Sequence, residues 1–169
     1  REEVLQMAGN CLLMMEKMKP IEESGNWDEA QGKEILELEK LQDAKQLEFV
    51  EFMTKLLATN LPHDLIDEAR KQIRLVDELE SISDCIESVF KRKRSLAKRD
   101  LIMESAERND ILGLHQQIYD FMVDVDRAIR DENVDLLENA AKTGEKITKS
   151  AKSLYRKQDT RPPYERLKP

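Results

Sequence analysis

Hydrophobic residues recur every three or four positions along most of the chain, a spacing that places them on one face of a helix. The first predicted helix spans about residues 2–18. Its apolar face consists of Val4, Met7, Cys11, Met14, Met15 and Met18. Pro20 and the turn at Ser24-Gly25-Asn26 are expected to end this helix, because proline cannot propagate one.

Four further helices are predicted, at about residues 28–58, 64–91, 106–130 and 134–155. Only a short break at residues 59–63 separates the second helix from the third, so these two should be antiparallel neighbours. The basic run at residues 91–94 is expected to end the third helix. There it would form a solvated C-terminus that complements the helix dipole, in preference to contacting an anionic membrane surface.

The composition supports an all-α fold, because the chain has only five Gly, five Pro and four Phe among 169 residues. Leu, Glu, Lys and Ala, which favour helices, are abundant instead. We expect an antiparallel helical bundle of about five long helices. The tail at residues 159–169 is expected to be extended, since Pro162 and Pro163 interrupt any helix there.

Charge and cysteine content narrow the classes of function. The net charge of −7 argues against nucleic-acid binding, which needs a basic face. Cys11 and Cys85 lie within helical patterns and are expected to be buried thiols in a reducing compartment. No stretch approaches the ~20 apolar residues of a membrane-spanning helix. Because the chain begins with Arg1, we expect it to be part of a longer protein.

A weak internal repeat is visible when the first helix is shifted by 107 positions. The shift places Val4 on Ile111 and keeps the other apolar positions of that face on apolar residues. Each of the two helices is followed by a short acidic turn and another long helix. We therefore expect residues 1–93 to form a first three-helix repeat and residues 94–158 a partial second one.

Carboxylates interrupt the apolar stripes of the second and third predicted helices. Glu39 and Asp43 have the spacing ExxxD, which puts both acids on one helix face. Glu80 and Asp84 repeat that spacing on the third helix. In a hairpin centred between residues 61 and 62, facing residues have numbers that add up to 123. The two pairs are therefore expected to meet at one level, about 28 Å from the turn.

Two interpretations of these four acids stay open. Acids on an inward stripe repel one another unless cations, protons or a metal neutralise them, and oxygen ligands favour magnesium, manganese, iron or calcium. Alternatively, both pairs lie at the edge of their stripes and face water, since Asp and Glu make up 35 of 169 residues. No zinc-finger spacing is present, and His63 and His115 are expected to be surface or satisfied histidines.

Two segments resemble the PhoU family. The segment VDELESISDCIESVF is similar to the family's signature helix, commonly written around LERIGDHAxNI, with matches at Leu79, Glu80, Ile82, Asp84 and Ile86. The segment ILELEKLQDAKQLEFVEFMTKLL resembles the preceding helix of the family, whose ELExxID pattern is matched at Glu39 and Asp43. The chain departs from the signature where Ser81, Ser83 and Cys85 replace the family's Arg, Gly and His.

The resemblance points to the PhoU-like domains attached to bacterial sodium/phosphate cotransporters. It implies a fold of two three-helix repeats and regulation of phosphate transport on the cytoplasmic side of the bacterial inner membrane. It also implies a divalent metal held by Glu39, Asp43, Glu80 and Asp84. The implied partners are the transmembrane transporter portion of the same chain and another copy of the domain. No organic cofactor and no catalytic residue are expected.

The alternative is a metal-free helical interaction module that docks partner helices on methionine-rich faces. A di-metal carboxylate enzyme is disfavoured, because such sites combine Glu with Glu-x-x-His pairs and the chain contains no Glu-x-x-His.

Overall fold

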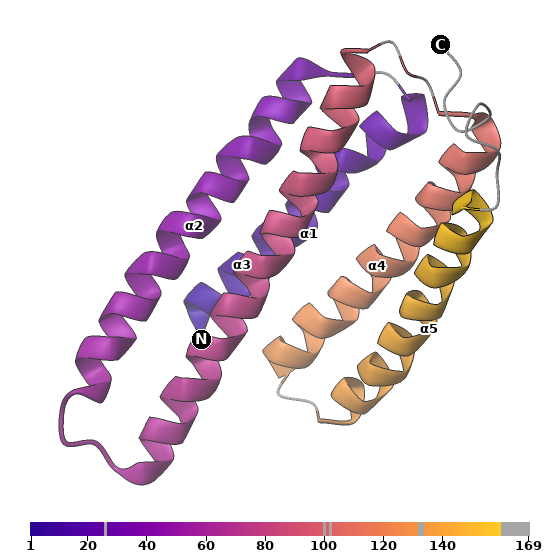
Figure 1. The fold of residues 1–169 in the computed structure, drawn as a ribbon. Helices are drawn as coiled ribbons and strands as arrows, with labels where there is room; N and C mark the ends of the chain where they lie inside the picture. Colours follow the sequence, from indigo (N-terminus) through magenta and orange to yellow (C-terminus); the bar gives the residue numbers. More distant parts are fainter. Residues whose placement is uncertain (26, 100, 102, 132–133, 160–169) are drawn as a thin grey trace.

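The structure is a computed structural model that describes residues 1–25, 27–99, 101, 103–131 and 134–159. Five helices account for nearly all of this part of the chain (Figure 1). They are α1 (Glu2–Ser24), α2 (Glu29–Leu57), α3 (His63–Ala97), α4 (Ser105–Asp131) and α5 (Val134–Asp159). The expected all-α antiparallel bundle is confirmed. The tail that we expected to be extended lies almost wholly outside the described residues.

The predicted end of the first helix is wrong, because α1 continues through Pro20 to Ser24. Proline lacks the N–H group that would bond to the preceding turn, which weakens the helix at that point. The next turn nevertheless buries Ile21 and Glu22, and this packing holds the helix together. The helix ends at Gly25, whose φ of 66° is a left-handed conformation that glycine adopts without strain.

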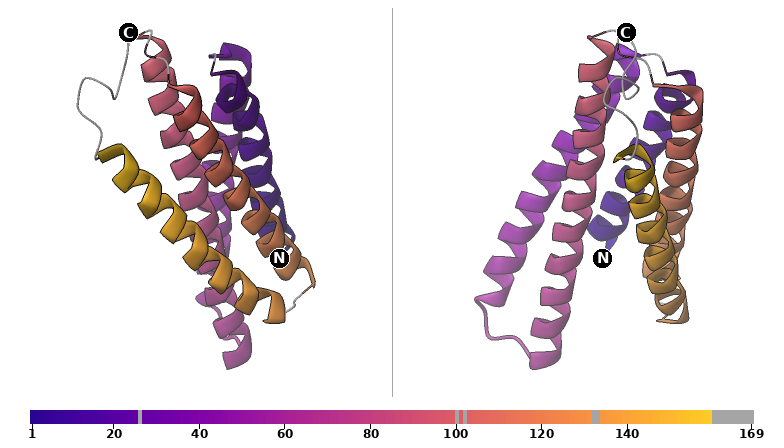
Figure 2. Two further views of the ribbon diagram at one scale, coloured as in Figure 1. Left: turned by 90° about the vertical axis from the view of Figure 1, so that its right-hand side faces the viewer. Right: turned by 45° about the vertical axis from the view of Figure 1, so that its right-hand side comes forward.

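The α2–α3 hairpin is long and begins at a capped helix start. The side chain of Asp28 accepts hydrogen bonds from the backbone N–H groups of Ala30 and Gln31, which satisfies two donors of the first turn. The turn between Leu57 and His63 reaches past the N-terminus of α1 in every view (Figures 1 and 2). That end of the hairpin exposes large apolar side chains, namely Leu47, Phe52 and Leu65.

The sequence predicted that the basic run at residues 91–94 ends the third helix. This prediction is wrong, because α3 continues to Ala97. Two of the four side chains of the run pair with acids on other helices. Lys93 Nζ lies 3.2 Å from Glu22 Oε1, and Arg94 Nη2 lies 2.5 Å from Glu29 Oε1. These pairs favour continued helix over a frayed end, since they tie the last turns of α3 to α1 and α2.

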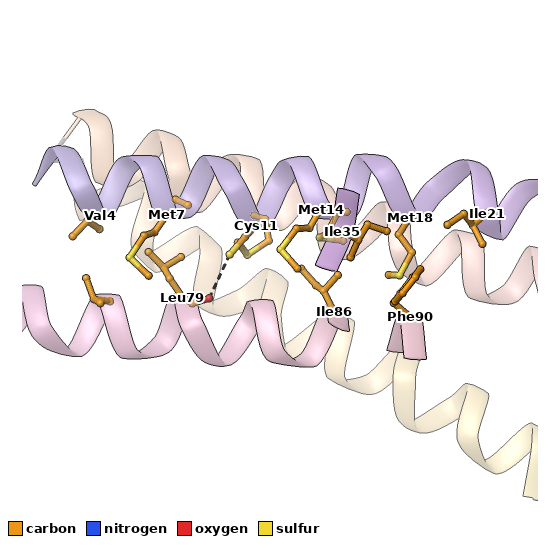
Figure 3. Close-up of a cluster of buried hydrophobic side chains, with 14 residues drawn as sticks. Val4, Met7, Cys11, Met14, Met18, Ile21, Ile35, Leu79, Ile86 and Phe90 are labelled. Carbon is orange, nitrogen blue, oxygen red and sulfur yellow. Dashed lines mark hydrogen bonds between the residues drawn. The ribbon is translucent and has the colours of Figure 1, made fainter. Parts of the chain in front are cut away.

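The core forms around α1, which packs against α2, α3 and α4. Figure 3 shows the side chains of α1 pointing toward Leu79, Ile86 and Phe90 of α3. The predicted apolar face of the first helix is entirely buried, including its four methionines. Gln42 and Ser83 are the polar residues that are 0% exposed among the described residues, and both are hydrogen-bonded: Gln42 Nε2 donates to the Met7 carbonyl oxygen at 3.0 Å and Ser83 Oγ to the Glu80 carbonyl oxygen at 2.7 Å.

The helices α4 and α5 form a second hairpin that joins the rest through α4 alone. Among the described residues, α4 packs against α1, and α5 packs only against α4. Figure 2 shows this hairpin beside the group of α1, α2 and α3. The expected division into a three-helix repeat and a partial second repeat remains a prediction.

The two cysteines differ in their surroundings, and the expectation that both are buried is wrong for Cys85, which is exposed. Cys11 is 0% exposed and its Sγ donates a hydrogen bond to the Leu79 carbonyl oxygen at 3.4 Å (Figure 3). Burial raises the pKa of the Cys11 thiol to about 11. At pH 8 that thiol stays protonated and therefore unreactive, because the thiolate is the nucleophile.

We expect N-ethylmaleimide to modify only Cys85 in the folded protein at pH 8. Mass spectrometry should show one adduct on the native protein and two adducts in denaturant. Replacing Cys85 with Ser should abolish modification of the native protein. Rapid modification of Cys11 without denaturant would contradict the packing of α1 described above.

Candidate metal centre

The register of the α2–α3 hairpin brings acidic side chains of the two helices to the same level. Gln46 Nε2 donates a hydrogen bond to Asp77 Oδ1 at 3.0 Å, and this pair obeys the register expected for a hairpin centred between residues 61 and 62. The same register places Glu39 opposite Asp84. The long, uninterrupted helices on both sides of the turn keep that pairing over several turns.

Three of the four predicted carboxylates gather in one place. One oxygen each from Glu39, Asp43 and Asp84 lies within 4.8 Å of the other two. The three residues differ in exposure: Glu39 is 9% exposed, Asp43 is half-buried and Asp84 is exposed. The three carboxylates therefore range from a buried one on α2 to an exposed one on α3.

Glu80, the fourth predicted carboxylate, lies beside this group rather than within it. Burial raises its pKa above the ordinary value, and the charges of Asp84, Asp43 and Asp77 raise it further. The half-buried Glu80 thus lies in the negative field of the cluster without contributing to its three-oxygen set. Its helical spacing to Asp84 puts it one turn nearer the hairpin turn.

Glu39 is buried among neighbouring negative charges. Burial raises its pKa above the ordinary value, and the carboxylates of Glu87, Asp43 and Asp84 raise it further, while Lys91 opposes the shift. Among the described residues, none forms a hydrogen bond or a close ion pair with the Glu39 carboxylate. A buried carboxylate in this position is stabilised by any cation that reaches it.

Glu87 and Lys91 belong to the site, although Lys91 was expected only to help end the third helix and Glu87 was not considered. They continue the face of α3 that carries Asp84, at intervals of three and four residues, so helical periodicity alone was sufficient to find them. Lys91 Nζ lies 2.6 Å from Glu87 Oε1. The predicted set of four acids is therefore part of a larger cluster that includes one cation.

The three oxygens fit a hard divalent cation. Calcium binds oxygen at 2.3–2.6 Å, so two ligands of one ion can lie up to about 5 Å apart. The 4.8 Å limit that contains the three oxygens falls within that span. Magnesium and manganese need a slightly closer approach, which rotation of the exposed Asp84 side chain would provide. Water molecules would complete the coordination on the open side.

A second group of charged side chains, which was not predicted, lies at the end of the hairpin farthest from the α2–α3 turn. Glu22 is 3% exposed; its Oε1 pairs with Lys93 Nζ at 3.2 Å, and its Oε2 lies 2.9 Å from His115 Nδ1. His115 is therefore buried with its Nδ1 close to the Glu22 carboxylate, which fits the paired histidine that the sequence allowed as the alternative to a surface one. His63 is exposed, as expected.

The fold and the cluster define the class of protein: an all-α bundle with a carboxylate-rich site between two antiparallel helices. No family model, curated protein or solved structure matches the chain. The resemblance of two segments to the PhoU family therefore stays a sequence-based expectation. None of the described helices combines the length and the apolar character needed to cross a membrane.

Proposed function

We propose that this chain is a regulatory domain of a bacterial sodium/phosphate transporter, on the cytoplasmic side of the membrane, that binds a divalent metal ion between α2 and α3. The observation that carries the metal site is the gathering of Glu39, Asp43 and Asp84 oxygens within 4.8 Å, one of them from a buried side chain. The link to phosphate transport is supported by the two segments similar to the PhoU family. No catalytic step is part of this proposal.

The physical argument for a metal is the cost of leaving the cluster without one. Like charges that cannot all be hydrated destabilise the folded chain, and a divalent cation replaces repulsion with attraction to each oxygen. Binding would therefore draw α2 and α3 together at this level. A regulatory role requires that the two states of the helices differ in their affinity for metal or partner.

We expect the protein to bind one Mn²⁺ ion with a dissociation constant of about 0.1–1 mM, the range of open, oxygen-only sites. Glu39→Gln should weaken binding at least about tenfold, because it removes the buried carboxylate of the three. Isothermal titration with MnCl₂ measures both values. The matched control is Glu37→Gln, which makes the same charge change at an exposed position of α2.

If Glu39→Gln and Glu37→Gln lose the same amount of Mn²⁺ affinity, the ion is attracted diffusely by an acidic protein and the proposed site is rejected. The regulatory part has its own readout: phosphate uptake by cells that express the protein within its transporter. Glu39→Gln should alter uptake and Glu37→Gln should not. Unchanged uptake together with lost Mn²⁺ binding would retain the metal site and reject its role in transport.

A metal-free interaction module is the second candidate, and two observations favour it. Asp84 is exposed, so one of the three ligands is well hydrated without a metal. Phe52 and Leu47 are 62% and 67% exposed near the protruding end of the hairpin. The methionine-rich face expected to dock partners does not serve this purpose, because α1 buries it in the core. Failure of wild-type protein to bind Mn²⁺ would favour this function.

A further inference from the structure

Lys91 is a cation already present beside the acidic cluster. Its ammonium group lies 2.6 Å from Glu87, whose side chain is only 13% exposed, whereas the Lys91 side chain itself is 61% exposed. Side chains on a helix lean toward its N-terminus, so the ammonium lies over the preceding turn of α3. That direction leads from Lys91 past Glu87 toward Asp84 and the facing Glu39.

The charges around Lys91 agree with this arrangement. The hydrogen bond from Lys91 to Glu87 raises the pKa of the ammonium, and the charges of Glu87, Glu39 and Asp84 raise it as well. Lys91 in turn lowers the pKa of Glu39, opposing the neighbouring acids. Lys91 therefore partly neutralises the carboxylates that would hold a metal.

We propose that Lys91 is a tethered competitor of the metal, which lowers the affinity of the Glu39, Asp43 and Asp84 site and is displaced toward solvent when a divalent cation binds. This inference rests on the proposed metal site. The 2.6 Å contact with Glu87 is the resting position of the ammonium, and its exposed stem leaves room for movement into water. Weakened affinity makes the site respond to changes in metal concentration instead of staying filled.

The size of the effect follows from Coulomb's law. An ammonium repels a divalent ion bound by neighbouring carboxylates, and in a half-exposed, hydrated site this repulsion is about 1–1.4 kcal/mol, which is a five- to tenfold change in affinity. Removing the ammonium should thus tighten binding by about five- to tenfold at low ionic strength. Salt screens exposed charges, so the difference should shrink toward twofold at about 0.5 M.

The test compares Mn²⁺ titrations of the wild-type chain, Lys91→Gln and Arg92→Gln. Arg92 is the next residue of α3, is exposed, and undergoes the same change of charge, but it points about 100° away around the helix. We expect Lys91→Gln to bind Mn²⁺ about five- to tenfold more tightly than wild type and Arg92→Gln to change it less than twofold. Circular dichroism checks that both variants are folded.

The melting temperature gives a second readout. Without metal, Lys91→Gln should melt at a lower temperature than wild type, and saturating Mn²⁺ should raise its melting temperature by more than it raises that of wild type. If both substitutions tighten Mn²⁺ binding equally, or if neither tightens it, the proposed role of Lys91 is overturned and the metal site is retained. Absence of Mn²⁺ binding in all three proteins overturns the metal site and this inference with it.

Discussion

Replacing Glu22 with Gln should destabilise the protein by about 3–5 kcal/mol, because it leaves the buried partners of a charge pair uncompensated. Glu22 joins three helices: it lies on α1, its Oε1 pairs with Lys93 of α3, and its Oε2 lies 2.9 Å from Nδ1 of His115 on α4. The Lys93 side chain is only 17% exposed, so water replaces the lost carboxylate incompletely. Urea unfolding at pH 7 measures the change in free energy.

The neighbouring residue supplies the control. Glu23 is exposed, and Glu23→Gln makes the same change of charge, with an expected effect within about 0.5 kcal/mol. Adding Lys93→Met to Glu22→Gln should restore part of the stability, since it removes the unpaired ammonium. A loss no larger than that of Glu23→Gln would show that the cluster is hydrated and contributes little.

Phe90→Ala should cost about 3–5 kcal/mol, the range for a large aromatic side chain removed from a packed interior. Phe90 is 1% exposed, and its ring lies 4.7 Å from that of Trp27, centroid to centroid. Gly32 on α2 allows this approach: a β-carbon there would lie 2.5 Å from Phe90 Cζ. Thermal unfolding should show a fall in melting temperature of about 10 °C.

The same substitution at Phe52 serves as the reference. Phe52 is 62% exposed on α2, so its loss removes little contact and should cost under about 1 kcal/mol. The contrast between two phenylalanines isolates packing from residue type. Similar losses at both positions would mean that Phe90 does not fill the space between α2, α3 and Trp27.

The sequence was sufficient to predict what depends on one helix or one hairpin. The apolar face of α1 follows from periodicity, and the level at which Glu39 meets Asp84 follows from the position of the turn. Both depend only on helix geometry: the face on 3.6 residues per turn, and the level on the rise of 1.5 Å per residue. The end of α1 was missed because Pro20 weakens a helix locally, while the burial of Ile21 that prolongs it depends on other elements.

Features made by three helices escaped prediction for the same reason. Glu22, Lys93 and His115 are separated by at least 22 positions in the sequence, and no spacing rule connects them. No pattern in the sequence predicted a buried Gln42. Its burial is possible because its amide donates to the Met7 carbonyl oxygen and accepts from Asn10 Nδ2. Lys91 could have been found from helical spacing, but its role depends on the facing Glu39.

Because α5 is attached through one interface, the free energy of local unfolding differs between α5 and the rest of the described bundle. Because α5 packs only against α4 among the described helices, it can detach without disturbing any contact of α2 or α3. The free energy of such partial opening is set by one interface, whereas α1 is released only when three interfaces break. The protein therefore contains a cooperative unit around α1 and a peripheral helix whose amide protons exchange at a lower energetic threshold.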